Sequence, residues 1–177
     1  MYQLLKQIIK TGIVTEAAPL ADEEMRAEPQ RLQQEILRIL GSALCIRHVD
    51  AGSCNGCELE IHSVNNAYYN IEGLGIKFVA SPRHADMLLI TGPVSRHMEE
   101  ALRRTFEATP DPKLVVAIGD CARDGGIFCM GDGGENYALC GGVAQVIPVD
   151  VLVKGCPPTP TAILQGILTA LSSKLPS

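Results

Sequence analysis

Short apolar runs alternate with segments of helical periodicity from residue 44 onward, and this alternation constrains the fold more than any other feature. Parallel strands need a crossover between them, which is usually a helix, so the alternation is typical of a parallel sheet. It predicts an α/β fold with a flavodoxin-like, doubly wound parallel sheet. The expected strands are residues 44–49, 76–79, 87–91, 114–118 and 149–153, and the expected helices are residues 58–70, 97–108 and 159–173.

The residues before this pattern have a different character. Residues 1–10 place apolar side chains at helical spacing beside Lys6 and Lys10, which predicts a short amphipathic helix. Such a helix suits a membrane surface, a partner protein or the end of its own domain. A linker rich in Ala, Glu and Pro and a second amphipathic segment follow it. We therefore divide the chain into an N-terminal helical extension and linker, residues 1–43, and a flavodoxin-like domain, residues 44–177.

Composition argues against several classes of function. The formal net charge is −5, aromatic residues make up 4% of the chain and there is no Trp, so the sequence lacks the features of a nucleic-acid binder. No apolar run reaches the length of a membrane span, and residues 1–10 lack the hydrophobic core of a signal peptide. We expect a cytoplasmic chain. In that reducing environment, seven cysteines favour metal or redox chemistry over disulfides.

Four of the cysteines share one context. Cys54 and Cys57 follow the first expected strand, Cys121 follows the fourth, and Cys156 follows the fifth. Because the carboxyl ends of parallel strands lie at one edge of the sheet, we expect these thiols to meet there. Glycines flank each of the three segments, which lets the backbone approach a bulky inorganic group closely. Four thiolates at one place predict a metal site.

The spacing of these cysteines bears on which metal they bind. Structural zinc sites usually combine two short local pairs, whereas this chain has one C-x2-C pair and two solitary cysteines. Iron-sulfur clusters accept widely dispersed cysteines, and a proline directly after the last ligand, as in Cys156-Pro157, is familiar from cluster loops. The spacing favours a cluster. A zinc site and a thioredoxin-like dithiol of Cys54 and Cys57 remain as alternatives.

The other three cysteines do not share that context. Cys45 lies within the first expected strand and is interpreted as a small buried hydrophobic residue. Cys129 and Cys140 lie in the glycine-rich segment 125–142, where we expect packing or loop thiols rather than ligands.

Four motifs carry a family resemblance: SCNGCELEI, SPRHADMLLITGPV, GDCARDGGIF and PVDVLVKGCPPTP. In this order they resemble the small, electron-transfer subunit of complex I-related, membrane-bound nickel-iron hydrogenases of the formate hydrogenlyase type. They are also similar to the 20 kDa cluster-bearing subunit of respiratory complex I. The resemblance covers about residues 44–172.

This resemblance implies a cofactor and a set of partners. It implies one 4Fe-4S cluster, bound by Cys54, Cys57, Cys121 and Cys156, which makes residues 44–177 an iron-sulfur domain. It also implies a large subunit that holds a nickel-iron centre or a quinone pocket, together with ferredoxin-like and membrane subunits of the same oxidoreductase complex. Membrane association is then peripheral, through partners, at the cytoplasmic face of the cell membrane.

One departure separates the two branches of the resemblance. The complex I subunit carries its first two ligands as adjacent cysteines, whereas Asn55 and Gly56 separate them here, as in the hydrogenases. We therefore expect an electron-transfer subunit of a membrane-associated hydrogenase complex. A complex I-type quinone oxidoreductase subunit is the alternative, followed by a free-standing dithiol or zinc module.

Acidic and basic residues near the motifs complete the expected site. Glu60 matches a glutamate of the complex I-like motif, which suggests a proton-linked role. Glu58 and Glu60 also stand where acids complement a helix dipole, and this alone would explain both. Arg83 lies in a segment that resembles one facing a partner subunit. Asp120 and Asp124 flank Cys121 and would lower the potential of a nearby cluster.

Overall fold

A central parallel sheet organises the computed structural model, which describes residues 42–129 and 136–173 together with Tyr2, Lys6, Lys10, Gln34 and Leu37. The predicted N-terminal extension therefore lies almost entirely outside the described residues. The strands are β1 (Leu44–Asp50), β2 (Ile76–Phe78), β3 (Met87–Thr91), β5 (Leu114–Ile118) and β7 (Val151–Val153). Their spatial order is β2-β1-β3-β5-β7, and every neighbouring pair is parallel. This is the doubly wound, flavodoxin-like order, so the predicted fold class is confirmed.

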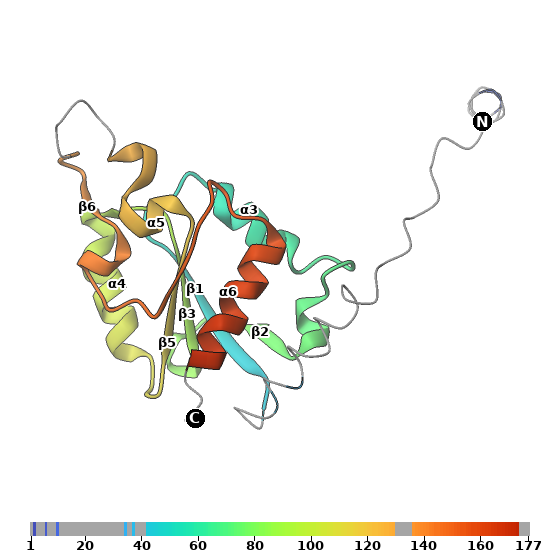
Figure 1. Cartoon of the computed structure of the whole chain (residues 1–177), viewed down its shortest axis with the longest axis horizontal. Helices are drawn as coiled ribbons and strands as arrows, with labels where there is room; N and C mark the ends of the chain where they lie inside the picture. The colour runs from blue at the N-terminus through green and yellow to red at the C-terminus, as the bar shows by residue number, and fades with distance from the viewer. Residues whose placement is uncertain are drawn as a thin grey trace.

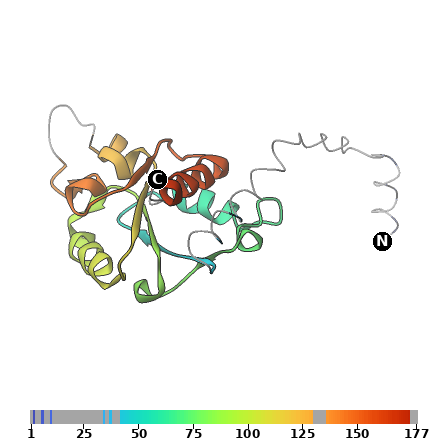
Figure 2. The ribbon, with the colours of Figure 1, turned by 60° about the horizontal axis from the view of Figure 1, so that its bottom comes forward.

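Helices cover both faces of this sheet. The helices α3 (Gly56–Ser63) and α6 (Pro160–Ser173) pack on one face, and α4 (Arg96–Ala108) and α5 (Asp120–Asp124) pack on the other (Figures 1 and 2). The central strand β3 and its neighbour β5 are buried at every residue. Strands buried on both sides have uninterrupted apolar sequences, and the runs MLLIT and LVVAI follow that rule.

The helix expected at 58–70 ends earlier, at Ser63. The Asn66 side chain accepts hydrogen bonds from the backbone N–H groups of Tyr68 and Tyr69, at 2.8 and 3.0 Å. Such local bonds offer the backbone an alternative to the helix. The short 3-10 helix η1 (Ile71–Leu74) then leads into β2.

Further differences concern short elements. The last strand begins at Val151 rather than 149, because the Asp150 side chain accepts the hydrogen bond of Val115 N–H at 2.7 Å. The sequence analysis also missed α5 and a small antiparallel pair, β4 (Val94–Ser95) with β6 (Leu139–Gly141). In the part of the chain that the structure describes, no helix is both long and apolar enough to span a bilayer.

Candidate metal centre

Four cysteines come together at the carboxyl edge of the sheet, the upper end in Figure 1. Cys54 lies in the β1–α3 loop, Cys57 in the first turn of α3, Cys121 in α5, and Cys156 in the loop between β7 and α6. The other three thiols all contribute to the electrostatic environment of the Cys57 thiol, and those of Cys54 and Cys156 also act on Cys121. The topology thus gathers thiols from three distant segments.

Hydrogen bonds to the backbone hold the loops that carry these cysteines in place. The Asp50 carboxylate accepts from the N–H groups of Gly52 and Ser53, each at 2.8 Å, and so shapes the turn before Cys54. The β5 and β7 loops are joined because Asp120 N–H donates to the Gly155 carbonyl at 2.9 Å. The thiols are therefore carried by a constrained backbone rather than by independent loops.

Two glycines lie directly against the buried thiols. A Cβ atom added to Gly119 would stand 2.7 Å from the Cys57 sulfur, and one added to Gly126 would stand 2.9 Å from the Cys121 sulfur. Both glycines also have positive φ angles, of 89° and 51°, which side-chain-bearing residues rarely adopt. Glycine is required here both for the turn and for the space around sulfur.

The four thiols differ in exposure, and the two buried ones have raised pKa values. Cys57 and Cys121 are buried, whereas Cys54 and Cys156 are exposed. Burial raises the pKa of the Cys57 thiol to about 12, with smaller contributions from Glu58 and from the other three thiols. Burial also raises the pKa of Cys121, followed by the influence of Cys156 and Cys54. Without a cation, the Cys57 and Cys121 thiols hold their protons, and a cationic inorganic group would displace those protons.

The structure gives no site for a single ion among its described residues. No group of three or more His, Cys, Asp or Glu side chains there is arranged to hold one metal ion. Two of the four thiols gathered at this edge are buried and two are exposed.

The remaining cysteines have other surroundings. The Cys45 thiol lies 3.9 Å from the Ala43 carbonyl and is only half-buried, so Cys45 is less buried than expected. Cys129 packs against Gly125. Cys140, on β6, donates to the Glu99 carboxylate of α4 at 3.3 Å. Cys45 and Cys140 thus have local contacts of their own, and the structure gives Cys129 a packing neighbour.

The two glutamates of α3 occupy different environments. Glu60 is half-buried, whereas Glu58 is buried and its Oε1 atom lies 3.7 Å from the Nε2 atom of His48. The same His48 nitrogen lies 3.0 Å from the Thr91 hydroxyl. Burial lowers the pKa of His48, against the opposing influence of Glu58 and Asp50. From the sequence, Glu60 has priority and Glu58 is explained by the helix dipole alone, so the burial of Glu58 was not predicted.

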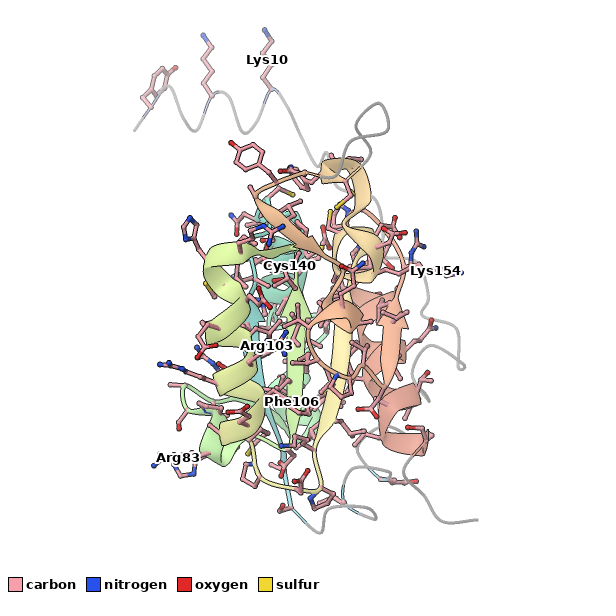
Figure 3. All side chains as sticks on the ribbon, turned by 90° about the vertical axis from the view of Figure 1, so that its left-hand side faces the viewer. Lys10, Arg83, Arg103, Phe106, Cys140 and Lys154 are labelled. Carbon is pink, nitrogen blue, oxygen red and sulfur yellow. The ribbon has the colours of Figure 1, made fainter. Side chains whose placement is uncertain are left out.

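Charged residues outside α3 are placed as follows. Arg83 lies in η2 (Pro82–His84), at the amino end of β3 and near the end of α4 away from Cys140 (Figure 3). It therefore stands at the sheet edge opposite to the cysteines. Asp120 and Asp124 do lie beside Cys121, but both carboxylates contact the Arg123 guanidinium, at 3.3 and 2.7 Å. Arg123 thus offsets part of their negative charge.

Known proteins resemble this chain over the region of the cysteines. The profile of a family described as NADH ubiquinone oxidoreductase, 20 Kd subunit, matches residues 54–170. A probable membrane-bound hydrogenase subunit, mbhJ of Pyrococcus furiosus, is 43% identical over 148 residues, covering 82% of this chain and 86% of that protein. Formate hydrogenlyase subunit 7 of Escherichia coli is 41% identical over 140 residues, covering 79% of this chain but only 53% of that protein.

A solved structure also resembles this chain. A chain in the structure of the membrane-bound sulfane sulfur reductase, described as an archaeal respiratory membrane complex, aligns with a TM-score of 0.64 and 33% identity. The alignment covers 80% of this chain and 74% of that chain. The similar proteins are thus subunits of oxidoreductase complexes.

Proposed function

This chain belongs to the family of the 20 kDa subunit of NADH-ubiquinone oxidoreductase, and we propose that it is the electron-transfer subunit of a membrane-associated hydrogenase complex. In this proposal it carries one 4Fe-4S cluster on Cys54, Cys57, Cys121 and Cys156. The observation that carries the proposal is the meeting of these four thiols, from three separate segments, at one edge of the sheet.

The donor set fits such a cluster. In a 4Fe-4S cluster each thiolate binds a different iron, so the four sulfurs stand around a bulky group rather than around one ion. Gly119 and Gly126 leave space beside the two buried sulfurs. The raised pKa of Cys57 fits a ligand that loses its proton only when a cationic group binds. When bound, the cluster would accept and release one electron at a time.

The chain itself would hold the cluster, exclude water from one side and present the other side to a partner. Cys57 and Cys121 lie on the buried side, and Cys54 and Cys156 on the outward side. Exposed apolar side chains occur on elements of the same edge: Leu59 on α3, and Ile127 and Phe128 on η3 (Gly126–Phe128), which follows α5. An apolar surface of this kind supports coverage by a large subunit.

Two features favour a hydrogenase partner. Asn55 and Gly56 separate the first two cysteines, which is the hydrogenase-like arrangement. The Pyrococcus furiosus relative, aligned over most of both chains, is named as a hydrogenase subunit. A quinone-site partner, as the family description suggests, is the alternative. In either case the chain would associate peripherally with the cytoplasmic face of the membrane, through its partner subunits.

Serine variants test the ligand set. Each of Cys54, Cys57, Cys121 and Cys156, changed to serine, should lose or convert the cluster, whereas Cys45→Ser, Cys129→Ser and Cys140→Ser should keep it. Electron paramagnetic resonance of the dithionite-reduced complex, with iron and sulfide analysis, measures this directly. A signal abolished by Cys129→Ser and kept in Cys121→Ser would contradict the proposed ligands.

A tag on this chain tests the partner. It should copurify a large subunit from membrane extracts, and nickel in that subunit identifies a hydrogenase. A large subunit without nickel that reduces or oxidises a quinone supports the alternative. A stable, cluster-loaded monomer without any partner would contradict both.

A further inference from the structure

Glu58 is an unusual buried side chain beside the four cysteines. It directly follows Cys57 in α3 and is 7% exposed. Neither of its carboxylate oxygens has a hydrogen-bond partner among the residues that the structure describes. Burying a carboxylate without hydrogen bonds is unfavourable for folding, because the charge loses its hydration. The stability of the fold therefore gives no reason for a glutamate at this position.

The helix dipole does not supply that reason either. It stabilises an acidic side chain in the first turn only modestly, and burying a carboxylate without a partner costs more than that. Glu58 packs between α3 and β1, where its nearest basic group is His48, 3.7 Å away. The imidazole also contacts the Thr91 hydroxyl, at 3.0 Å. Since burial lowers the pKa of His48, the ring is poorly suited to neutralise the carboxylate.

Glu58 acts electrostatically on the site. Among the influences that raise the pKa of Cys57, Glu58 comes after burial and ahead of the other three thiols. The carboxylate oxygens have almost no contact with solvent, so water screens their charge only weakly. Asp120 and Asp124, in contrast, both contact Arg123. The Glu58 carboxyl group thus lies close to a buried cysteine of the site, without a hydrogen-bond partner among the residues that the structure describes.

We propose that Glu58 sets the reduction potential of the cluster to a low value, and that His48 and Thr91 are positioning residues for its carboxylate. The inference rests on the proposed function, since it requires a cluster on the four cysteines. Reduction adds one electron, and therefore one negative charge, to the cluster. A fixed carboxylate nearby repels that charge and favours the oxidised form.

The test is a redox titration of the complex purified through a tag on this chain, with dithionite as reductant and electron paramagnetic resonance as readout. Glu58→Gln keeps the size of the side chain and removes its charge, so the midpoint potential should shift to a higher value. Glu58→Asp keeps the charge and should stay closer to the wild type. Glu72→Gln is the matched control: it removes an exposed carboxylate at the amino end of β2 and should leave the potential unchanged.

The outcomes separate this inference from the proposed function. If the wild-type complex shows no cluster signal, the proposed function fails. If the wild type and Glu58→Gln both show a full signal at the same potential, the proposed function stands and the role of Glu58 is wrong.

Unfolding of the full chain in urea provides a second, independent measurement in case Glu58→Gln loads its cluster poorly. Glu58→Met removes an uncompensated buried charge and fills the same space with an apolar side chain, so the cluster-free variant should unfold at a higher urea concentration than the wild type. A lower concentration would show that contacts of the carboxylate stabilise the fold. That result would overturn the proposal that the charge is retained for the cluster.

Discussion

At the carboxyl end of the sheet, glycines with positive φ lie against the buried thiols, whereas at the amino end charged side chains bond to the backbone at the ends of strands and helices. Gly119 and Gly126 represent the first end, where backbone approaches sulfur. At the second end, the Asp86 carboxylate accepts from Cys45 N–H at 2.9 Å, and the Lys113 ammonium donates to the carbonyls of Phe106 and Thr109 at 2.9 and 2.8 Å. In our proposal the first end is shaped to hold a ligand, and the contacts at the second end stabilise the fold.

Two glycines with positive φ, one at each end of the sheet, test this difference most strongly. Gly119→Ala should abolish cluster binding, because the new Cβ would stand 2.7 Å from the Cys57 sulfur. Gly75→Ala is the control for a positive φ away from sulfur: its φ is 83° and its ψ 24°, in the left-handed helical region, and nothing lies within 4 Å of the added Cβ. It should lose roughly 1–2 kcal/mol of stability. Gly119→Ala should lose more, because the φ of 89° and ψ of 163° at Gly119 are adopted almost only by glycine. Iron and sulfide analysis of both variants checks the prediction, and equal cluster loss in the two would contradict it.

At the amino end, Lys113→Met should destabilise the fold and leave the cluster intact. The ammonium bonds two carbonyls at the end of α4 and lies 4.4 Å from the centroid of the Phe106 ring. Hydrogen bonds from charged donors contribute about 1.5–3 kcal/mol each, and methionine keeps the apolar packing of the stem. We expect a net loss of roughly 2 kcal/mol in urea unfolding, with an unchanged paramagnetic signal. A changed signal would show that the two ends are coupled.

The carboxyl end also makes stability depend on pH, through the Cys57 thiol. The pKa of Cys57 is about 12 in the folded chain without a cluster, above the ordinary thiol value of about 8.5. As the pH rises, the unfolded chain loses this proton first, so the stability that the neutral thiol contributes is complete below the ordinary value and is lost progressively toward pH 12. The free energy of unfolding of the cluster-free chain should fall by at most roughly 1 kcal/mol per pH unit in this window.

Cys57→Ser provides the control for this pH dependence. It removes the titrating thiol, so the decrease in unfolding free energy between about pH 9 and about pH 10 should be smaller than in the wild type. The cluster-loaded chain should also lack most of the decrease, because its thiolates are already deprotonated. An equally steep decrease in Cys57→Ser would assign it to other groups.

The sequence predicts the elements of this molecule better than the environments of single side chains. The runs at β3 and β5 have the predicted boundaries because both faces of each strand are buried, which leaves an unbroken apolar signal. The five-residue helix α5 is too short to produce helical periodicity. The burial of Glu58 and Glu60 depends on which side of α3 packs against β1, and their positions in the helix do not specify that side. The convergence of the thiols was predictable, since it follows from topology.

Replacing Glu60 has the smallest expected effect on the midpoint potential of the cluster. It compares a half-buried carboxylate with the buried carboxylate of Glu58, two residues earlier. We retain the proposal that Glu60 has a proton-linked role. Glu60→Gln should then keep the cluster and change how strongly the midpoint potential of the cluster depends on pH. Reduction adds a negative charge to the cluster, and a nearby carboxyl group then binds a proton more readily. Its potential at a fixed pH should shift less than that of Glu58→Gln, since water screens the half-buried charge more effectively. Redox titrations at several pH values measure both quantities. An unchanged pH slope together with unchanged turnover would leave Glu60 with its helix-dipole role alone.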